Sequence, residues 1–340
     1  MMGKECSPMK QTKDIDYIFL STRVKAMERN LLTRERIERM LEAPTNEEAA
    51  KVLVDCGYSE MTEITNSELD RVLSEQQQAM MADLGGCAPN PYIVDVFRLR
   101  CDYHNAKVLV KADALGTPPD RLLMAGGRYD RQRLAQSYQR EEMLAYSDTF
   151  RRGVARAREI LGSTGDPQLA DFTLDRAYFE ELSALAQESG SPFLKDYAAL
   201  LADVANLRSC VRASRLGRGT EFLNQVLVPG GTVSVRSLAS ARGEELNNLF
   251  RTGRLTDAAA EGASRSAPGS GALTEFERLC DNAVMKFFRD GRSVPFGAQP
   301  ILGYLHAREA EATAIRIIMS GRMAGLDTDI IRERLRDCYV

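Results

Sequence analysis

The stretch PFLKDYAALLADVANLRSCVRASRLG, residues 192–217, decides the fold of this chain. It begins with proline and ends with glycine, which are typical of the first turn of a helix and of the position just past its end. Apolar residues recur between them at helical spacing, which predicts a helix of about 25 residues and about 37 Å with one buried stripe. The stripe consists of Phe193, Tyr197, Leu200, Leu201, Val204, Leu207 and Val211.

The same spacing occurs three times along the chain. Each copy has a proline, a basic residue sixteen positions later, an acid five before that base, and a glycine nine beyond it. The three sets are Pro91, Asp102, Lys107 and Gly116; Pro192, Asp203, Arg208 and Gly217; and Pro300, Glu311, Arg316 and Gly325. A register kept three times indicates a triplicated unit of about 100 residues.

Two further elements recur around each long helix. A shorter helix precedes it, and the segments between units carry a glycine pair followed by Leu-Ala. The echoes are Leu69-Asp70-Arg71, Leu174-Asp175-Arg176 and Phe276-Glu277-Arg278, then Gly126-Gly127 and Gly230-Gly231; residues 33–53 resemble the inter-unit element at the front of the chain. We expect Thr173 and Thr274 to cap their helices, and Asp327 to cap a short closing helix.

These patterns predict an all-α fold in which three-helix units form a three-lobed funnel with pseudo-threefold symmetry. The expected boundaries are 14–116 for the first repeat, 117–217 for the second, and 218–340 for the third with the closing helix. β-branched runs and alternating patterns are scarce, which disfavours strands. We expect residues 1–13 to be a tail and Gly262 to Ala272 to be a loop.

Composition points to a cytoplasmic protein. The net charge of -3 comes from 45 basic and 48 acidic residues, so no overall field attracts nucleic acid or anionic lipid. The seven cysteines form no Cys-x-x-Cys pair, which is typical of reduced thiols. No apolar run approaches the length of a membrane span, and no signal peptide is recognised at the start.

The residues that catalysis commonly needs are scarce. His104 and His306 are the two histidines, and we expect His104 to be a packing or surface residue. The chain has no phosphate-binding loop ending in Gly-Lys-Ser/Thr and no Asp-Asp dipeptide for magnesium. We therefore expect a protein without catalytic activity, cofactor, metal or small-molecule ligand.

The repeated bases Lys107, Arg208 and Arg316 allow two interpretations. Each could pair with the acid on the shorter helix of its own unit, because a charge on an apolar helix needs a partner. Alternatively, all three could converge on a central cavity and bind a partner protein. The acids concerned are Asp70, Asp175 and Glu277.

Arginine clusters form a second group of candidates. Arg212 and Arg215 follow Arg208 near the end of the middle long helix, where the helix dipole favours cations. They could also form a docking face for an acidic partner, and the cluster from Arg151 to Arg158 is similar. A helical scaffold or an RNA-binding protein using these arginines is the alternative function, which salt-dependent RNA binding would test.

The C-terminal part carries a resemblance to a known family. The run from Gly303-Tyr304-Leu305 to Tyr339-Val340 resembles the closing segment of the C subunit of V/A-type ATP synthases, which is related to the d subunit of the vacuolar ATPase. Supporting positions are Tyr17, Arg23, Val24, Arg36, Asn105 and Asn206, and the similarity runs over residues 14–340. The third repeat has Ala314 where the others have asparagine, and the loop from Gly262 looks like an insertion.

The resemblance implies a non-catalytic subunit of the central rotor stalk. One end would contact the ring of membrane-embedded proteolipid subunits, and the other would hold the foot of the central shaft, formed by D- and F-type subunits. The protein would transmit torque between ATP turnover and H⁺ or Na⁺ transport, associated peripherally with the membrane. The ring face should be shallow and polar, and the shaft socket deeper, with aliphatic walls bordered by Lys107, Arg208 and Arg316.

Overall fold

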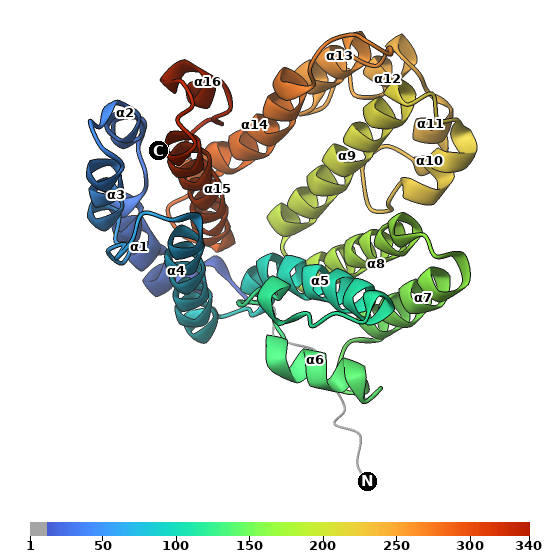
Figure 1. Ribbon diagram of the computed structural model, residues 1–340, viewed down its shortest axis with the longest axis horizontal. Coiled ribbons are helices and arrows are strands. Elements are labelled where there is room, and N and C mark those ends of the chain that lie inside the picture. The colour runs from blue at the N-terminus through green and yellow to red at the C-terminus, as the bar shows by residue number, and fades with distance from the viewer. Residues whose placement is uncertain (1–11) are drawn as a thin grey trace.

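The computed structural model describes residues 12–340, and within this range every regular element is a helix, so the all-α prediction is confirmed (Figure 1). Of the predicted tail, residues 1–13, the first eleven lie outside the described residues. Three long helices carry the repeated spacing, and a shorter helix precedes each of them. The long helices are α5 (Tyr92–Leu115), α9 (Pro192–Arg215) and α15 (Ala298–Met323), and the preceding helices are α4 (Asn66–Cys87), α8 (Pro167–Glu188) and α14 (Thr274–Asp290).

Short helices fill the intervals between these pairs. At the front lie α1 (Ile18–Met27), α2 (Arg34–Glu42) and α3 (Asn46–Asp55). Between the units lie α6 (Arg131–Gln139), α7 (Asp148–Thr164), α10 (Thr220–Val226), α11 (Val235–Ser240), α12 (Glu244–Leu249) and α13 (Thr256–Ser264), and α16 (Thr328–Glu333) follows the last long helix. The 3-10 turns are η1 (Asp14–Tyr17), η2 (Glu28–Asn30), η3 (Asp120–Leu122) and η4 (Gly291–Ser293).

The repeated prolines and glycines mark the ends of the long helices as predicted. Pro91 lies one residue before α5, Pro192 is the first residue of α9, and Pro300 lies in the first turn of α15. The glycines after the helices, Gly116, Gly217 and Gly325, have φ angles of 62°, 63° and 68°. Glycine adopts this left-handed conformation without the steric cost that a Cβ atom brings, which explains why each helix ends there.

Several cap and loop predictions are wrong. Thr173 lies inside α8, because Asp166 and Pro167 start this helix six residues earlier; the Asp166 side chain accepts the amide of Gln168. Thr274 opens α14 but makes no capping bond. Asp327 does occupy the N-cap position of α16, as predicted, although its side chain makes no capping bond. The predicted loop from Gly262 begins within α13, where Gly262 packs against Phe276 and Val211.

Each long helix packs against the shorter helix of the next unit as well as that of its own. Helix α5 lies along α8, α9 along α14, and α15 along α4. The last of these pairs joins the final third of the chain to the first, as the neighbouring blue and red helices in Figure 1 show. The six helices therefore form a closed ring of contacts that runs from α4 through α5, α8, α9, α14 and α15 and back to α4.

The repeated acid on each of the first two long helices holds the segment that follows it. Asp102 accepts the amide of Tyr129 and pairs with Arg128 at 2.8 Å. Asp203 accepts the amides of Thr232 and Val233. Both acids are fully buried or nearly so, and a buried carboxylate is stable only when hydrogen bonds satisfy it.

An asparagine three positions after each of these acids forms a second clamp. The Asn105 side chain donates to the carbonyl of Met124 and accepts its amide. Asn206 makes the same two bonds with Val228, at 2.9 and 2.8 Å. Each asparagine side chain thus satisfies both the N–H and the C=O of one backbone residue, as a neighbouring strand does in a β-sheet.

In the third unit the equivalent acid closes the ring. Glu311 accepts the backbone amide of Leu32 and the hydroxyl of Tyr58, and it pairs with Arg308 at 2.6 Å. Leu32 and Tyr58 belong to the front of the chain, where the sequence echoes the inter-unit element. A separate cluster of buried apolar side chains joins α2, α3 and α4 to Ile315, Ile318 and Met319 of α15.

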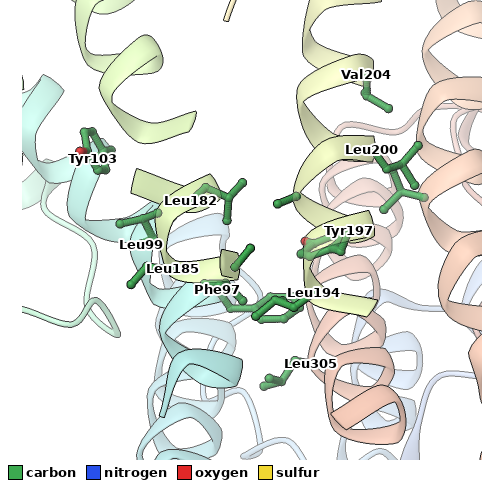
Figure 2. Close-up of a cluster of buried hydrophobic side chains, with 14 of the residues drawn as sticks. Phe97, Leu99, Tyr103, Leu182, Leu185, Leu194, Tyr197, Leu200, Val204 and Leu305 are labelled. Atoms are coloured by element: carbon green, nitrogen blue, oxygen red, sulfur yellow. The ribbon is translucent and has the colours of Figure 1, made fainter. Parts of the chain in front are cut away.

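The N-terminal halves of the three long helices converge at the centre of the ring. The rings of Phe97 and Tyr197 stack with their centroids 5.7 Å apart. Figure 2 shows Phe97 of α5, Leu194 and Tyr197 of α9, and Leu305 of α15 gathered at this junction. From there the helices point in three directions (Figure 1).

We predict that Asn206→Ala lowers the free energy of unfolding by about 2–4 kcal/mol, because it leaves the buried amide and carbonyl of Val228 without partners. Urea denaturation of the purified protein measures the loss. The exposed Asn224 provides the control, and Asn224→Ala should change stability by less than about 0.5 kcal/mol. Equal effects of the two substitutions would contradict the clamp.

Candidate functional site

A cavity lies where the three long helices meet. Its volume is about 310 Å³, and it is lined by residues of α5, α8, α9, α14 and α15. Leu31 and Leu32 add the front of the chain, and residues 336–340 add its C-terminal segment. Residues of all three long helices therefore line one cavity.

The walls of this cavity are largely apolar and aromatic. Val96 and Phe97 come from α5, Tyr178 from α8, and Tyr197 and Val204 from α9. Burial in these surroundings raises the pKa of the Tyr178 and Tyr197 hydroxyls above the ordinary value, so both remain protonated donors at neutral pH.

Two groups of charges interrupt the apolar walls. Arg100 of α5 and Glu309 of α15 lie 3.9 Å apart across the junction. Burial raises the pKa of the Glu309 carboxyl, and Arg100 opposes that rise. Arg208 and Arg336 form the second group, both paired with Asp281 of α14 at 2.6 and 2.7 Å.

His306 occupies the same junction. Its ring stacks on Phe288 with the centroids 4.5 Å apart. Burial lowers the pKa of His306 to about 4; the charge of Asp281 opposes this shift and the charge of Arg100 adds to it. The imidazole is therefore neutral at physiological pH and serves as an aromatic wall of the cavity.

The repeated bases all find acids, but in the neighbouring unit and not in their own. Lys107 pairs with Asp175 at 2.6 Å, Arg208 with Glu277 at 2.6 Å, and Arg316 with Asp70 at 2.9 Å. The prediction named the right acids, but it was wrong in pairing each base with the acid of its own unit. The reason is the packing of each long helix along the next unit's shorter helix, which places that acid opposite the base.

Of the three bases, only Arg208 also lines the central cavity. Lys107 and Arg316 do not line this cavity; they lie at the contacts between units, where their side chains are 26% and 45% exposed. Their role in binding a partner stays a prediction.

Arg212 and Arg215 lie beyond Arg208 on α9, outside the cavity. Arg212 pairs with Glu277 at 2.6 Å, and Arg215 donates to the carbonyl of Gly271 at 2.7 Å. The predicted cluster is thus engaged with α14 and the loop before it. His104 is exposed and its ring nitrogen lies 3.0 Å from the carbonyl oxygen of Leu122, in agreement with the expected surface role.

Sequence reasoning missed Arg100, Glu309 and the C-terminal segment as cavity residues. The signal was present, because Arg100 and Glu309 both lie nine positions after a repeated proline. A search for identical residues in the three copies passes over them, since their charges are opposite.

Buried thiols, acidic side chains and long helices of the described residues bear on three roles, those of a thiol nucleophile, a metal site and a membrane span. Burial raises the pKa of the Cys101, Cys210 and Cys280 thiols to about 12, so they are not nucleophiles at neutral pH. Across the described chain, no group of three or more His, Cys, Asp or Glu side chains is placed to bind a metal. None of the helices between residues 12 and 340 has the length and apolarity needed to cross a membrane.

We predict that Arg208→Ala destabilises the isolated protein more than Arg316→Ala. The side chain of Arg208 is 25% exposed and pairs with two acids, whereas Arg316 is 45% exposed and its partner Asp70 is 62% exposed. Removing Arg208 should cost about 1–3 kcal/mol and removing Arg316 less than about 1 kcal/mol, as for partly buried and exposed pairs. Urea denaturation at low salt gives both values, because urea is uncharged and does not screen the ion pairs. A loss for Arg316→Ala as large as that for Arg208→Ala would overturn the ranking.

A second prediction concerns acid stability. The histidine of the unfolded chain takes up a proton near pH 6.5 and the folded His306 only near pH 4, so acidification between these values favours unfolding. We expect the wild type to lose about 2–3 kcal/mol more stability than His306→Gln between pH 6.5 and pH 4. Thermal or urea denaturation across this range measures the difference, and parallel pH profiles would refute the burial of a neutral imidazole.

Comparison with known proteins identifies the family of this chain. The sequence profile described as ATP synthase (C/AC39) subunit matches residues 20–334. The C subunit of the V-type sodium ATPase of Enterococcus hirae is 23% identical over 326 residues, which cover 96% of this chain and 99% of the relative. The C subunit of the V-type ATP synthase of Thermus thermophilus is 24% identical over 336 residues, covering 94% and 98%. The C subunit of the A-type ATP synthase of Haloferax volcanii is 27% identical over 249 residues, covering 69% and 70%. Because the family profile spans nearly the whole chain, this protein belongs to the ATP synthase (C/AC39) subunit family.

Proposed function

We propose that this chain is a non-catalytic subunit of the central stalk of a V/A-type rotary ATPase. Its central cavity receives the foot of the shaft, made of D- and F-type subunits, and the opposite face rests on the proteolipid ring. It transmits torque that couples ATP turnover in the head to H⁺ or Na⁺ transport. Membership of the family supports a role in the complex. The observation that carries the finer assignment is a cavity lined by residues of all three long helices.

The ring of lobes has the mechanical properties that torque transmission requires. Each contact between lobes combines helix packing with one of the three charged pairs, and the third contact joins the two ends of the chain. A ring without a free edge resists twisting better than an open array, because load at one lobe passes to both neighbours. We infer that the body turns as one unit, as a three-lobed funnel.

We retain the three sequence repeats, 14–116, 117–217 and 218–340, as the proposed units of duplication. These boundaries describe how the sequence was duplicated and do not delimit separate structural domains. The reason is that each long helix also packs along the shorter helix of the next repeat. The proposed location is the cytoplasmic surface of the membrane, reached through the complex.

The arginine clusters give little support to the alternative of RNA binding. Arg151 pairs with Asp148 and Arg156 with Glu159, while Arg158 contacts both Asp113 and Glu141. Arg212 also has an acidic partner within the chain. Phosphate binding depends on unneutralised positive charge, which these pairs reduce.

A cavity-filling substitution tests the socket. Thr313 of α15 is exposed, lines the cavity and donates its hydroxyl to the carbonyl of Glu309. We predict that Thr313→Trp lowers the affinity for the purified shaft subunit at least tenfold, because the indole occupies the space the shaft needs. Binding of the proteolipid ring by the same variant should be unchanged.

Thr22 of α1 supplies the matched control, since it is exposed, donates in the same way to the carbonyl of Ile18, and lies outside the cavity lining. Thr22→Trp should bind the shaft as the wild type does in calorimetric titration. The proposal is refuted if the wild type binds neither shaft nor ring. The socket assignment alone is refuted if Thr313→Trp binds the shaft with wild-type affinity.

A further inference from the structure

Three equivalent positions of the repeat face the central cavity with three different chemical characters. Nine residues after the repeated prolines stand Arg100, Leu201 and Glu309. All three line the cavity, one from each long helix. The three lobes thus present a cation, an aliphatic side chain and an anion at the same level of a pseudo-threefold site.

Arg100 is open to a partner, and Glu309, whose side chain is 17% exposed, lies beside it at the edge of the open space. The side chain of Arg100 is 66% exposed, so it reaches into the open part of the cavity. The nearest nitrogen and oxygen of Arg100 and Glu309 are 3.9 Å apart, which is beyond hydrogen-bonding distance. A partner that enters between them can therefore offer each charge a closer counterion than it has now.

The positions of Arg100, Leu201 and Glu309 differ from those seven residues later on the same helices. Seven residues later stand Lys107, Arg208 and Arg316, which carry the same charge in all three copies and pair at 2.6 to 2.9 Å with acids of the neighbouring lobe. That level uses its charges to hold neighbouring lobes together, although Arg208 also lines the cavity. At the level of Arg100 the copies have diverged, and the difference lies on the cavity side.

An unmarked pseudo-threefold socket would accept an inserted foot in three orientations of similar energy. A coupling that carries torque must hold one of them, since a foot that moves between orientations dissipates the rotation. Walls of different charge make the three orientations differ in energy. An orientation that places like charges together is penalised, and the one that places opposite charges together is favoured.

We propose that Arg100, Leu201 and Glu309 form an orientation key in the socket. The partner is a helical foot that carries an acidic side chain toward α5, a basic side chain toward α15 and an apolar side chain toward α9. This inference rests on the proposed function, because it specifies the chemistry of the shaft segment that the cavity receives.

The test exchanges the two charges. Arg100→Glu combined with Glu309→Arg keeps both signs in the cavity and their mutual attraction, so the melting temperature should stay within about 2 °C of the wild type. The key is reversed, however, and we predict that affinity for the purified shaft subunit falls at least tenfold. An exposed pair outside the cavity, Arg39 and Asp55, provides the control when it is exchanged in the same way.

The outcomes separate the key from the socket. Weaker shaft binding by the exchanged pair, with unchanged binding by the control, supports the key. Wild-type affinity of the exchanged pair overturns the key while the socket stands, whereas failure of the wild type to bind the shaft overturns both. Should the exchanged variant not fold, Arg100→Gln with Glu309→Gln replaces it. Its affinity should then fall at least threefold and lose its dependence on salt, and unchanged affinity would overturn the key.

Discussion

The structure depends on a buried acid in the middle of each long helix that binds backbone groups of a segment from another part of the chain. Asp102 and Asp203 bind the segments that follow them, and Glu311 binds Leu32, nearly the whole chain away. A carboxylate buried at this depth is costly unless amides or cations satisfy it, so each acid is stable only with its segment in place. The hydrogen bond from Leu32 to Glu311 therefore joins the front of the chain to its last long helix.

Closure of the ring of contacts then accounts for the central cavity. Because each long helix packs against the shorter helices before and after it in this ring, the N-terminal halves of α5, α9 and α15 are held at one junction, and the cavity is the space that their side chains leave there. The charged pairs between lobes lie one heptad beyond this junction along the same helices. The same stripe of each helix therefore holds the body together at one level and faces the cavity at another.

Much of the fold could be predicted from the sequence, because the signals are local. Proline and glycine mark helix ends through φ preferences that act within one turn, and Gly116, Gly217 and Gly325 all have the expected conformation. The acid that each base binds could not be assigned, since three equivalent units offer each base three similar acids, and only the packing between units decides. The cavity residues Arg100 and Glu309 were not predicted, for a different reason. Repeat analysis detects residues that the copies share, whereas these two residues occupy the same repeat position with opposite charges.

The most direct test of the central claim is an electron cryomicroscopy map of this protein bound to its shaft subunit. The account predicts a helical foot between α5, α9 and α15, in contact with the walls formed by Phe97, Tyr197 and His306. A shaft that ends on the outer surface of the ring of lobes, with the central cavity free of it, would contradict the account.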